Sequence, residues 1–386
     1  MKRFVLCVLA CCAAPDVAPP LVPVAMPASP LDAALVSTLQ LDAAPDAPPP
    51  ASEPEVWLKG STHVHAKPSG DSTVPIDEVI KWYEDRGYDF IAITDHNRVS
   101  EIDNADTHGH VALRDADPNN PKALVVLSGI ELTHNPSGCL PPGDKSKKCR
   151  IHVNVLGPTA RPGGKLEWAE RHSHERLDMY QAAMLTSRAL DGVLVQINHP
   201  QWFWGMTGDV LSELAKRGAT LVEIANVQFT KWNKGDKDHP STEQLWDDVL
   251  GRGLTMWGIA SDDAHDYPGL GHHRNMKWPA GGGWIVVKAR RNAHAILDAL
   301  AAGHFYASTG VVLDKAEVDG TALVVEVDPA AAGTYQIDWI ENGAVVATEP
   351  AEHGKPAHRE LPAKGYLRAD ITRDDGTEAW VEPGRR

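Results

Sequence analysis

The sequence predicts an α/β fold of the TIM-like barrel type over residues 55–310, followed by a small all-β module over residues 311–386. Three observations predict this. Short apolar runs alternate with segments of helical spacing, six or seven such units follow one another, and the pattern changes to period-two alternation after Gly310. Alternating strands and helices are typical of parallel βα units, and this number of units favours a barrel over an open sheet.

The individual elements follow from hydrophobic spacing and turn signals. The apolar runs that predict buried strands are residues 88–94, 123–127, 151–156, 192–197, 220–225 and 254–260, after a first strand that ends at Gly60–His65. Helical spacing predicts helices over residues 75–86, 177–190, 242–252 and 293–302. Near the C-terminus, alternation over residues 322–327 and 334–339 precedes Asn342-Gly343, a pair that predicts a β-hairpin.

Composition limits the classes of function. A chain of 386 residues with 42% hydrophobic content can bury one large core or two smaller ones. Its formal net charge of −15 repels polyanions, so no nucleic-acid partner is expected. The chain has neither a nucleophile-elbow motif nor a Walker loop. A small-molecule substrate remains the best expectation.

The N-terminal segment has the features of an export signal. Met1-Lys2-Arg3 precede an apolar run, Phe4 to Ala10, that is too short to span a bilayer. Val8-Leu9-Ala10-Cys11 resembles a bacterial lipobox, and the alternatives are an ordinary cleaved signal or a cytoplasmic chain. We expect a signal or lipoprotein signal peptide over residues 1–20 and an Ala/Pro-rich disordered linker over residues 21–54.

The expected location is therefore outside the cytoplasm of a bacterium. The protein would be periplasmic or anchored to the membrane by a lipid on Cys11, with no transmembrane helix in the mature chain. Beyond the N-terminal segment only Cys139 and Cys149 occur. In an oxidising compartment these two would form a disulfide across a long insertion, whereas in the cytosol they would be free thiols.

Metal-ligating residue types follow the expected strands one after another. On an extended backbone, side chains two residues apart point the same way, so His63 and His65 can reach one ion. Any single histidine here is more simply a core residue with a buried hydrogen bond, but six placements in order are improbable by chance. Imidazole and carboxylate ligands without thiolate suit zinc, manganese or iron. The further candidates at strand ends are Asp95, His96, Glu131, His152, His199, Asp263 and His265.

The ordered motifs HxH, TDH, GIE, H, NHP and DxH resemble the PHP (polymerase and histidinol phosphatase) superfamily over roughly residues 56–310. The segment Gly303–Gly310 is similar to the CehA/McbA-type branch of that superfamily. The resemblance implies a distorted (β/α)7 barrel that holds two or three metal ions. It also implies three ligand sets: His63, His65, Glu131 and Asp263 for one ion, Glu131, His152 and His199 for a second, and Asp71, His96 and His265 for a third. Glu131, Asp263 and Asp95 are the residues expected to carry catalysis.

Charge counting indicates the substrate class. Three divalent ions and three carboxylates leave about three positive charges, which attract an anion, and a hydroxide bridging two ions can attack it. The leading hypothesis is a metal-dependent phosphoesterase. The alternative is hydrolysis of a carbamate, amide or ester, with Trp202, Phe203 and Trp204 lining an apolar pocket. A third hypothesis is a non-catalytic surface module that binds through its β module.

Overall fold

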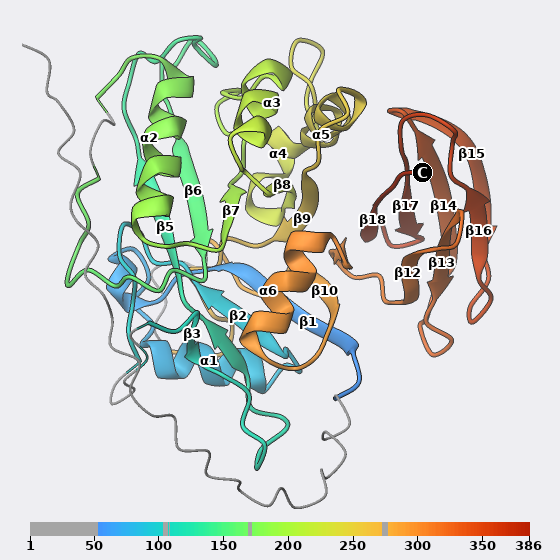
Figure 1. Ribbon diagram of the computed structural model, residues 1–386, viewed down its shortest axis with the longest axis horizontal. Helices are drawn as coiled ribbons and strands as arrows, with labels where there is room; N and C mark the ends of the chain where they lie inside the picture. Colours follow the sequence, from blue (N-terminus) through green and yellow to red (C-terminus); the bar gives the residue numbers. More distant parts are fainter. Residues whose placement is uncertain (1–52, 103–106, 108, 169–171, 272–276) are drawn as a thin grey trace, which may run out of the picture. The chain divides into compact units, whose positions relative to one another are not determined.

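The computed structural model describes residues 53–102, 107, 109–168, 172–271 and 277–386 (Figure 1). The expected signal peptide, the lipid site at Cys11 and the linker up to residue 52 lie outside the described residues. Residues 52–386 belong to one compact unit.

Most of the described secondary structure lies in three sheets. The ten-stranded sheet has the order β15 (Ala344–Ala351), β14 (Tyr335–Glu341), β17 (Leu367–Arg373), β18 (Glu378–Gly384), β11 (Phe305–Ser308), β10 (Trp284–Ala289), β1 (Val56–Val64), β2 (Phe90–Ile93), β4 (Val125–Leu127) and β3 (Ala112–Arg114). The five-stranded sheet has the order β5 (Gly129–His134), β6 (Ile151–Leu156), β7 (Leu194–Ile197), β8 (Leu221–Asn226) and β9 (Trp257–Ser261). A three-stranded sheet contains β12 (Leu313–Asp319), β13 (Ala322–Val327) and β16 (Ala357–Glu360).

The described helices are short, and each lies between two strands in the sequence. They are α1 (Ile76–Glu84), α2 (Arg176–Ala189), α3 (Gly208–Lys216), α4 (Thr230–Asn233), α5 (Thr242–Gly251) and α6 (Ala293–Ala302), with 3₁₀ turns η1 (Lys67–Ser69) and η2 (Val227–Phe229). Local sequence fixes several ends. A capping box of Ser241 and Gln244 begins α5, and Gly303 ends α6 with a left-handed φ of 75°. Within the described part of the chain, no helix has the length and apolar character needed to cross a membrane.

The predicted (β/α)7 barrel is wrong. The strands form open sheets of mixed direction, and among the strands that the structure describes only β1–β2, β2–β4, β7–β8 and β8–β9 are parallel neighbours. Parallel neighbours need a crossover connection, usually a helix, and the chain lacks one at several places. Between β5 and β6 it runs through the disulfide loop, and this pair is antiparallel. Between β4 and β5 only Ser128 intervenes, so the chain passes directly from one sheet to the other.

Most of the individual elements were nevertheless predicted. The expected strand 151–156 is β6 and the expected helix 293–302 is α6, with the same bounds. The strand expected at 254–260 begins later, as β9. The Asn342-Gly343 hairpin is confirmed, because β14 pairs with β15 and both turn residues have positive φ, 51° and 81°. The following strands continue the large sheet through the pairing of β18 with β11.

Candidate metal centre

The backbone brings the ends of distant strands to one place. His65 N donates to Ala264 O over 2.9 Å, and Ala264 N donates to His63 O over 3.3 Å. This bridge places the His63–His65 pair against the turn that carries Asp263 and His265. A second bridge joins His96 and Glu131 across the gap between β2 and β5. Residues more than 150 positions apart therefore meet because β1 and β2 end beside the ends of β5 and β9.

Three groups of histidine and carboxylate ligand atoms lie close enough to hold metal ions. The ligand atoms in each group lie within 4.8 Å of one another. The groups are His65, Asp71, His96 and His265; His63, Glu131 and His199; and His63, His65 and Asp263. All these residues except Asp71 and His96 are buried. The structure thus contains buried His/Asp/Glu clusters that could bind metal ions.

The grouping differs in detail from the three expected ligand sets. His63, His65 and Asp263 stay together as expected, and so do Asp71, His96 and His265. His65 also joins the second of these groups, because its ring stacks on His265 with a centroid separation of 4.1 Å. His152 is in none of the groups, but its Nδ1 lies 3.0 Å from Glu131 Oε1. Its Nε2 lies 2.9 Å from Asn135 Oδ1.

The position of the proton on His63 indicates that the cluster requires positive charge. His63 Nδ1 lies 2.6 Å from Glu223 Oε1. An ionised carboxylate only accepts, so Nδ1 carries a proton, and in the neutral ring Nε2 presents a lone pair. That Nε2 lies 3.2 Å from Asp263 Oδ1 and 3.4 Å from Glu131 Oε1. A lone pair facing two carboxylates is repulsive, so this position calls for positive charge, either a metal ion or a proton on Nε2. Burial disfavours the protonated ring, but Asp263 and Glu223 outweigh it and raise the pKa of His63.

The same reasoning applies to His265. Its Nδ1 lies 2.8 Å from the backbone carbonyl of Asp263, which only accepts, so Nδ1 carries a proton. Its Nε2 lies 3.2 Å from Asp71 Oδ2. Histidine ligands of metals commonly donate their second N–H to a carboxylate or a carbonyl in this way.

Several ligand atoms have no hydrogen-bond partner among the described residues. Buried polar atoms are normally paired, so each of these positions points to a missing group. They are Nε2 of His63, His65 and His265, both ring nitrogens of His199, and Oδ1 of Asp71 and Asp263. The donor set consists of nitrogen and oxygen without sulfur, which fits Zn²⁺, Mn²⁺ or Fe²⁺.

Glu131 lies at the centre of the cluster and is fully buried. Its Oε1 accepts from Asn198 Nδ2 over 2.9 Å and its Oε2 accepts from Thr133 Oγ1 over 3.0 Å. His96 Nδ1 lies 2.5 Å from Oε2. Burial opposes ionisation of Glu131, but His152 and His96 outweigh it and hold the carboxyl pKa well below its usual value. Glu131 is thus an anion within ion-pair distance of His63, His96 and His199.

The pKa values of the acids and histidines in the centre are shifted in opposite directions, some raised and some lowered. Burial favours the neutral acids, but the nearby imidazoles hold the pKa values of Asp71 and Asp263 below the usual range. Burial also disfavours protonated histidine, yet Glu131 and Asp71 raise the pKa of His96 to about 10. Burial and the neighbouring His265 and His96 lower the pKa of His65 to about 3. The carboxylates therefore stay ionised and attract cations.

Two acidic neighbours of the ligands have other partners. Asp95, expected to be catalytic, accepts from Ala66 N over 2.7 Å and from the hydroxyl of Ser100. It belongs to none of the three groups of ligand atoms. Asp262 accepts from the backbone N–H groups of Gly281 and Gly282, whereas Asp263 faces the histidines. Asp263 is the acid that this turn gives to the cluster.

Glu223 is the functional residue that sequence reasoning missed. It is buried in β8 and contacts His63, Ser261 Oγ at 2.6 Å and the backbone N–H of His199 at 2.5 Å. It therefore orients one ligand and the backbone of another. The available signal was a carboxylate in the middle of an otherwise apolar strand, Leu221–Asn226.

Aromatic rings surround the His199 side of the centre. The Trp202 ring lies 5.2 Å from the His199 ring and 5.6 Å from the His152 ring, between centroids. Phe229 lies 4.6 Å from His199, and Phe203 stacks on Trp202 at 5.5 Å. These apolar rings limit water on this side and strengthen the electrostatic interactions of the ligands.

No family model matches the chain, and a search of curated proteins also finds no match. The assignment of a function therefore rests on the geometry of the centre and on the sequence motifs.

Proposed function

We propose that the protein is a metal-dependent hydrolase, most specifically a phosphoesterase with a di- or trinuclear centre. The observation that carries the proposal is the set of imidazole lone pairs and ionised carboxylates that converge without hydrogen-bond partners among the described residues. A structural site would be closed by four ligands, whereas here the three groups contain eight residues, six of them buried. The order of the sequence motifs resembles that of the PHP superfamily. It supports the same proposal even though the sheets do not form the barrel that this resemblance implies.

The residues would divide the work as follows. His63, His65 and Asp263 would hold one ion, and Asp71, His96 and His265 another, with Glu131 between them. Divalent ions at such positions polarise substrate oxygens and lower the pKa of water. Glu223 keeps His63 in the Nδ1–H tautomer, and the Asp263 carbonyl does the same for His265.

Charge favours an anionic substrate. Asp71, Glu131, Asp263 and the nearby Glu223 supply four negative charges, so a centre loaded with three divalent ions carries a net positive charge. In addition, the cationic side chains of Lys148 and Arg150 lie over the Phe203 ring at 5.0 Å each. A phosphoester is negatively charged, so it would be attracted both to the metal ions and to these two cationic side chains.

The second candidate is hydrolysis of a carbamate, amide or ester. It is favoured by the aromatic rings next to His199, which would bind an apolar leaving group. In that case Trp202→Ala would weaken transition-state binding by about 1–3 kcal/mol, and inorganic phosphate would compete weakly.

The experiment that separates the candidates uses the full chain. Bound metal is measured first, and phosphomonoesters, phosphodiesters and aryl carbamates are then screened with and without Mn²⁺ and Zn²⁺. We expect metal-dependent cleavage of a phosphoester and inhibition by inorganic phosphate. His199→Ala should abolish it, whereas the control His358→Ala, which removes an exposed histidine, should not. A metal-loaded protein that cleaves no phosphoester and ignores phosphate would refute the proposal.

We also propose that the protein is exported. The structure bonds Cys139 to Cys149, with a Cα–Cα distance of 6.1 Å. Disulfides persist mainly in oxidising compartments, which supports the export signal seen in the sequence. Thiol titration of protein from the periplasm should find no free Cys139 or Cys149, and two free thiols would contradict this.

A further inference from the structure

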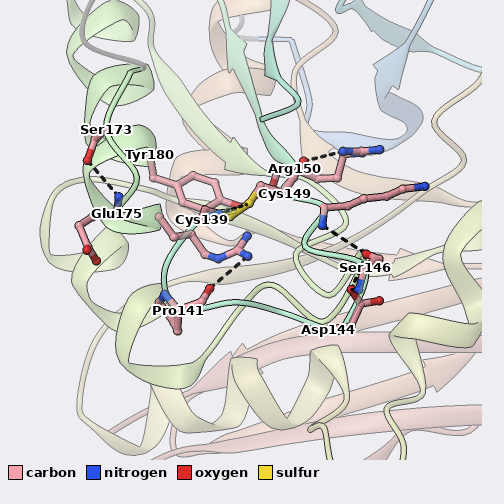
Figure 2. The surroundings of a disulfide bond; sticks show 11 residues. Cys139, Pro141, Asp144, Ser146, Cys149, Arg150, Ser173, Glu175 and Tyr180 are labelled. Carbon is pink, nitrogen blue, oxygen red and sulfur yellow. Dashed lines mark hydrogen bonds between the residues drawn. A yellow bond between two sulfur atoms is a disulfide. The ribbon is translucent and has the colours of Figure 1, made fainter. Parts of the chain in front are cut away.

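Arg150 lies over the ring of Trp202, which also contacts His152 near the metal centre. It directly precedes β6 and closes the loop that the Cys139–Cys149 disulfide joins (Figure 2). Because side chains two residues apart on an extended backbone point the same way, Arg150 lies on the same side of the chain as His152. Their Cα atoms are separated by about 7 Å on such a backbone.

The guanidinium of Arg150 is held in place without being neutralised. Its Cζ lies 4.8 Å from the centroid of Trp202 and 5.0 Å from that of Phe203. One terminal nitrogen donates to Cys149 O over 2.6 Å, and the buried Nε has no partner among the described residues. Nor does any carboxylate that the structure describes lie within ion-pair distance of it.

The geometry of the guanidinium shows which of its N–H donors remain available to a ligand. The rings occupy the face of the group, while its five N–H donors point outward in its plane. Only one of its nitrogens has a hydrogen-bond acceptor among the described residues. The remaining N–H donors of the terminal nitrogens can bind a carboxylate or a phosphate.

The aromatic rings beneath Arg150 are themselves fixed. Phe203 and Trp204 have left-handed φ values of 59° and 58°, which bulky residues adopt only when their surroundings enforce it. The disulfide loop packs on this segment at Gly143, where an added Cβ would lie 2.0 Å from Phe203 O. The loop, the rings and Arg150 therefore form one built surface next to His152.

We propose that Arg150 binds a second anionic group of the substrate, about one aromatic ring away from the bond that is hydrolysed. This inference rests on the proposed function and adds its substrate class: a phosphoester whose leaving group carries a carboxylate or a further phosphate. Trp202 lies between the two positions, since its ring faces Arg150 and contacts the His152 ring edge-on. The uncompensated cation is the feature that selects such a substrate.

The kinetic test uses two isosteric substrates. 4-Carboxyphenyl phosphate and 4-carbamoylphenyl phosphate differ in one charge at that distance. We expect the carboxylate to be preferred by roughly 10- to 100-fold in kcat/KM, the range of a hydrogen bond to a charged group. Arg150→Gln should remove the preference, so that the two substrates are turned over with similar kcat/KM. Arg150→Lys should restore part of it, and Lys145→Gln, an exposed change in the same loop, should retain it.

A binding test keeps this inference separate from the proposed function. Calorimetry with the two corresponding non-hydrolysable phosphonates measures the same preference whether or not any ester is cleaved. A preference in binding that Arg150→Gln removes supports the subsite even if hydrolysis fails. Equal binding of both phosphonates to the folded protein, or a preference that survives Arg150→Gln, overturns the subsite even if hydrolysis succeeds.

Discussion

Two clusters of charged side chains in this protein differ in whether their charged and polar atoms are paired. The first surrounds Arg368, whose guanidinium donates to Asp247 over 2.8 and 2.9 Å, to Asp370 over 2.5 Å and to Glu243 over 3.3 Å. Tyr366 Oη adds a bond of 2.7 Å to Asp247. Every nitrogen of this guanidinium has an acceptor, so the cluster is complete and joins α5 to β17.

The second cluster is the metal centre, which is incomplete by the same criterion. His63, His265 and His199 each retain a ring nitrogen without a partner among the described residues. Fixed carboxylates face these nitrogens at 3.2–3.9 Å, as between His63 and Asp263 or His199 and Asp263. A cluster that stabilises the fold pairs its own charges, whereas one that binds a ligand leaves some unpaired. The difference distinguishes structure from function here better than the number of charged residues does.

The largest effect should come from Glu131→Ala. This change removes the carboxylate that lies 2.5 to 3.8 Å from ring nitrogens of His63, His65, His96, His152 and His199. We expect the loss of at least one ion per chain and of nearly all hydrolytic activity, measured by elemental analysis and by the phosphoester assay. Glu352→Ala, which removes an exposed acid, is the control and should change neither quantity. Unchanged metal content in Glu131→Ala would refute the assignment of Glu131.

The next effect is on stability and should leave the metal untouched. Arg368→Leu removes the cation from the complete cluster and leaves Asp247 and Asp370 without it. Since these carboxylates are partly exposed, at 14% and 20%, we expect a loss of about 3 kcal/mol in unfolding free energy, the low end for such pairs. Arg386→Leu, which breaks an exposed pair, should cost about 0–1 kcal/mol. A fall in metal affinity in Arg368→Leu would mean that the two clusters are coupled.

The sequence predicted the ligands better than the fold. His63, Glu131 and Asp263 could be predicted because metal-ligating residue types follow or end successive apolar runs, a pattern that does not depend on whether the sheets are open or closed. The open sheets of mixed direction could not be predicted because strand direction depends on the connections. The break at Ser128 and the disulfide loop before β6 leave no trace in hydrophobic spacing. Glu223 was missed because its role depends on β8 lying opposite β1.

A smaller effect is expected from a residue that touches no substrate. Glu223→Gln keeps the shape of the side chain but replaces the charged acceptor of His63 Nδ1. Loss of such a partner typically weakens metal binding by about 10- to 100-fold. Competition with a chelator of known affinity measures this, and Glu213→Gln, on the exposed side of α3, is the matched control. If the affinity is unchanged, Glu223 supports only the fold.

The smallest effect is a pH dependence of the unfolding free energy. It should come from the metal centre and not from the Arg368 cluster. Without metal, the pKa of His96 is raised to about 10, so the stability it contributes is complete below its unfolded pKa of about 6.5 and is lost as the pH rises toward 10. The pKa values of His65 and His152 are lowered, to about 3 and 4, so these groups cost stability as the pH falls from about 6.5. Metal competes with the protons of the centre and binds more tightly at higher pH. The difference in unfolding free energy between metal-loaded and chelated protein should therefore grow steadily from about pH 6 to 9. The Arg368 cluster titrates identically in both samples and cancels, so a difference that stays constant with pH would show that no metal displaces these protons.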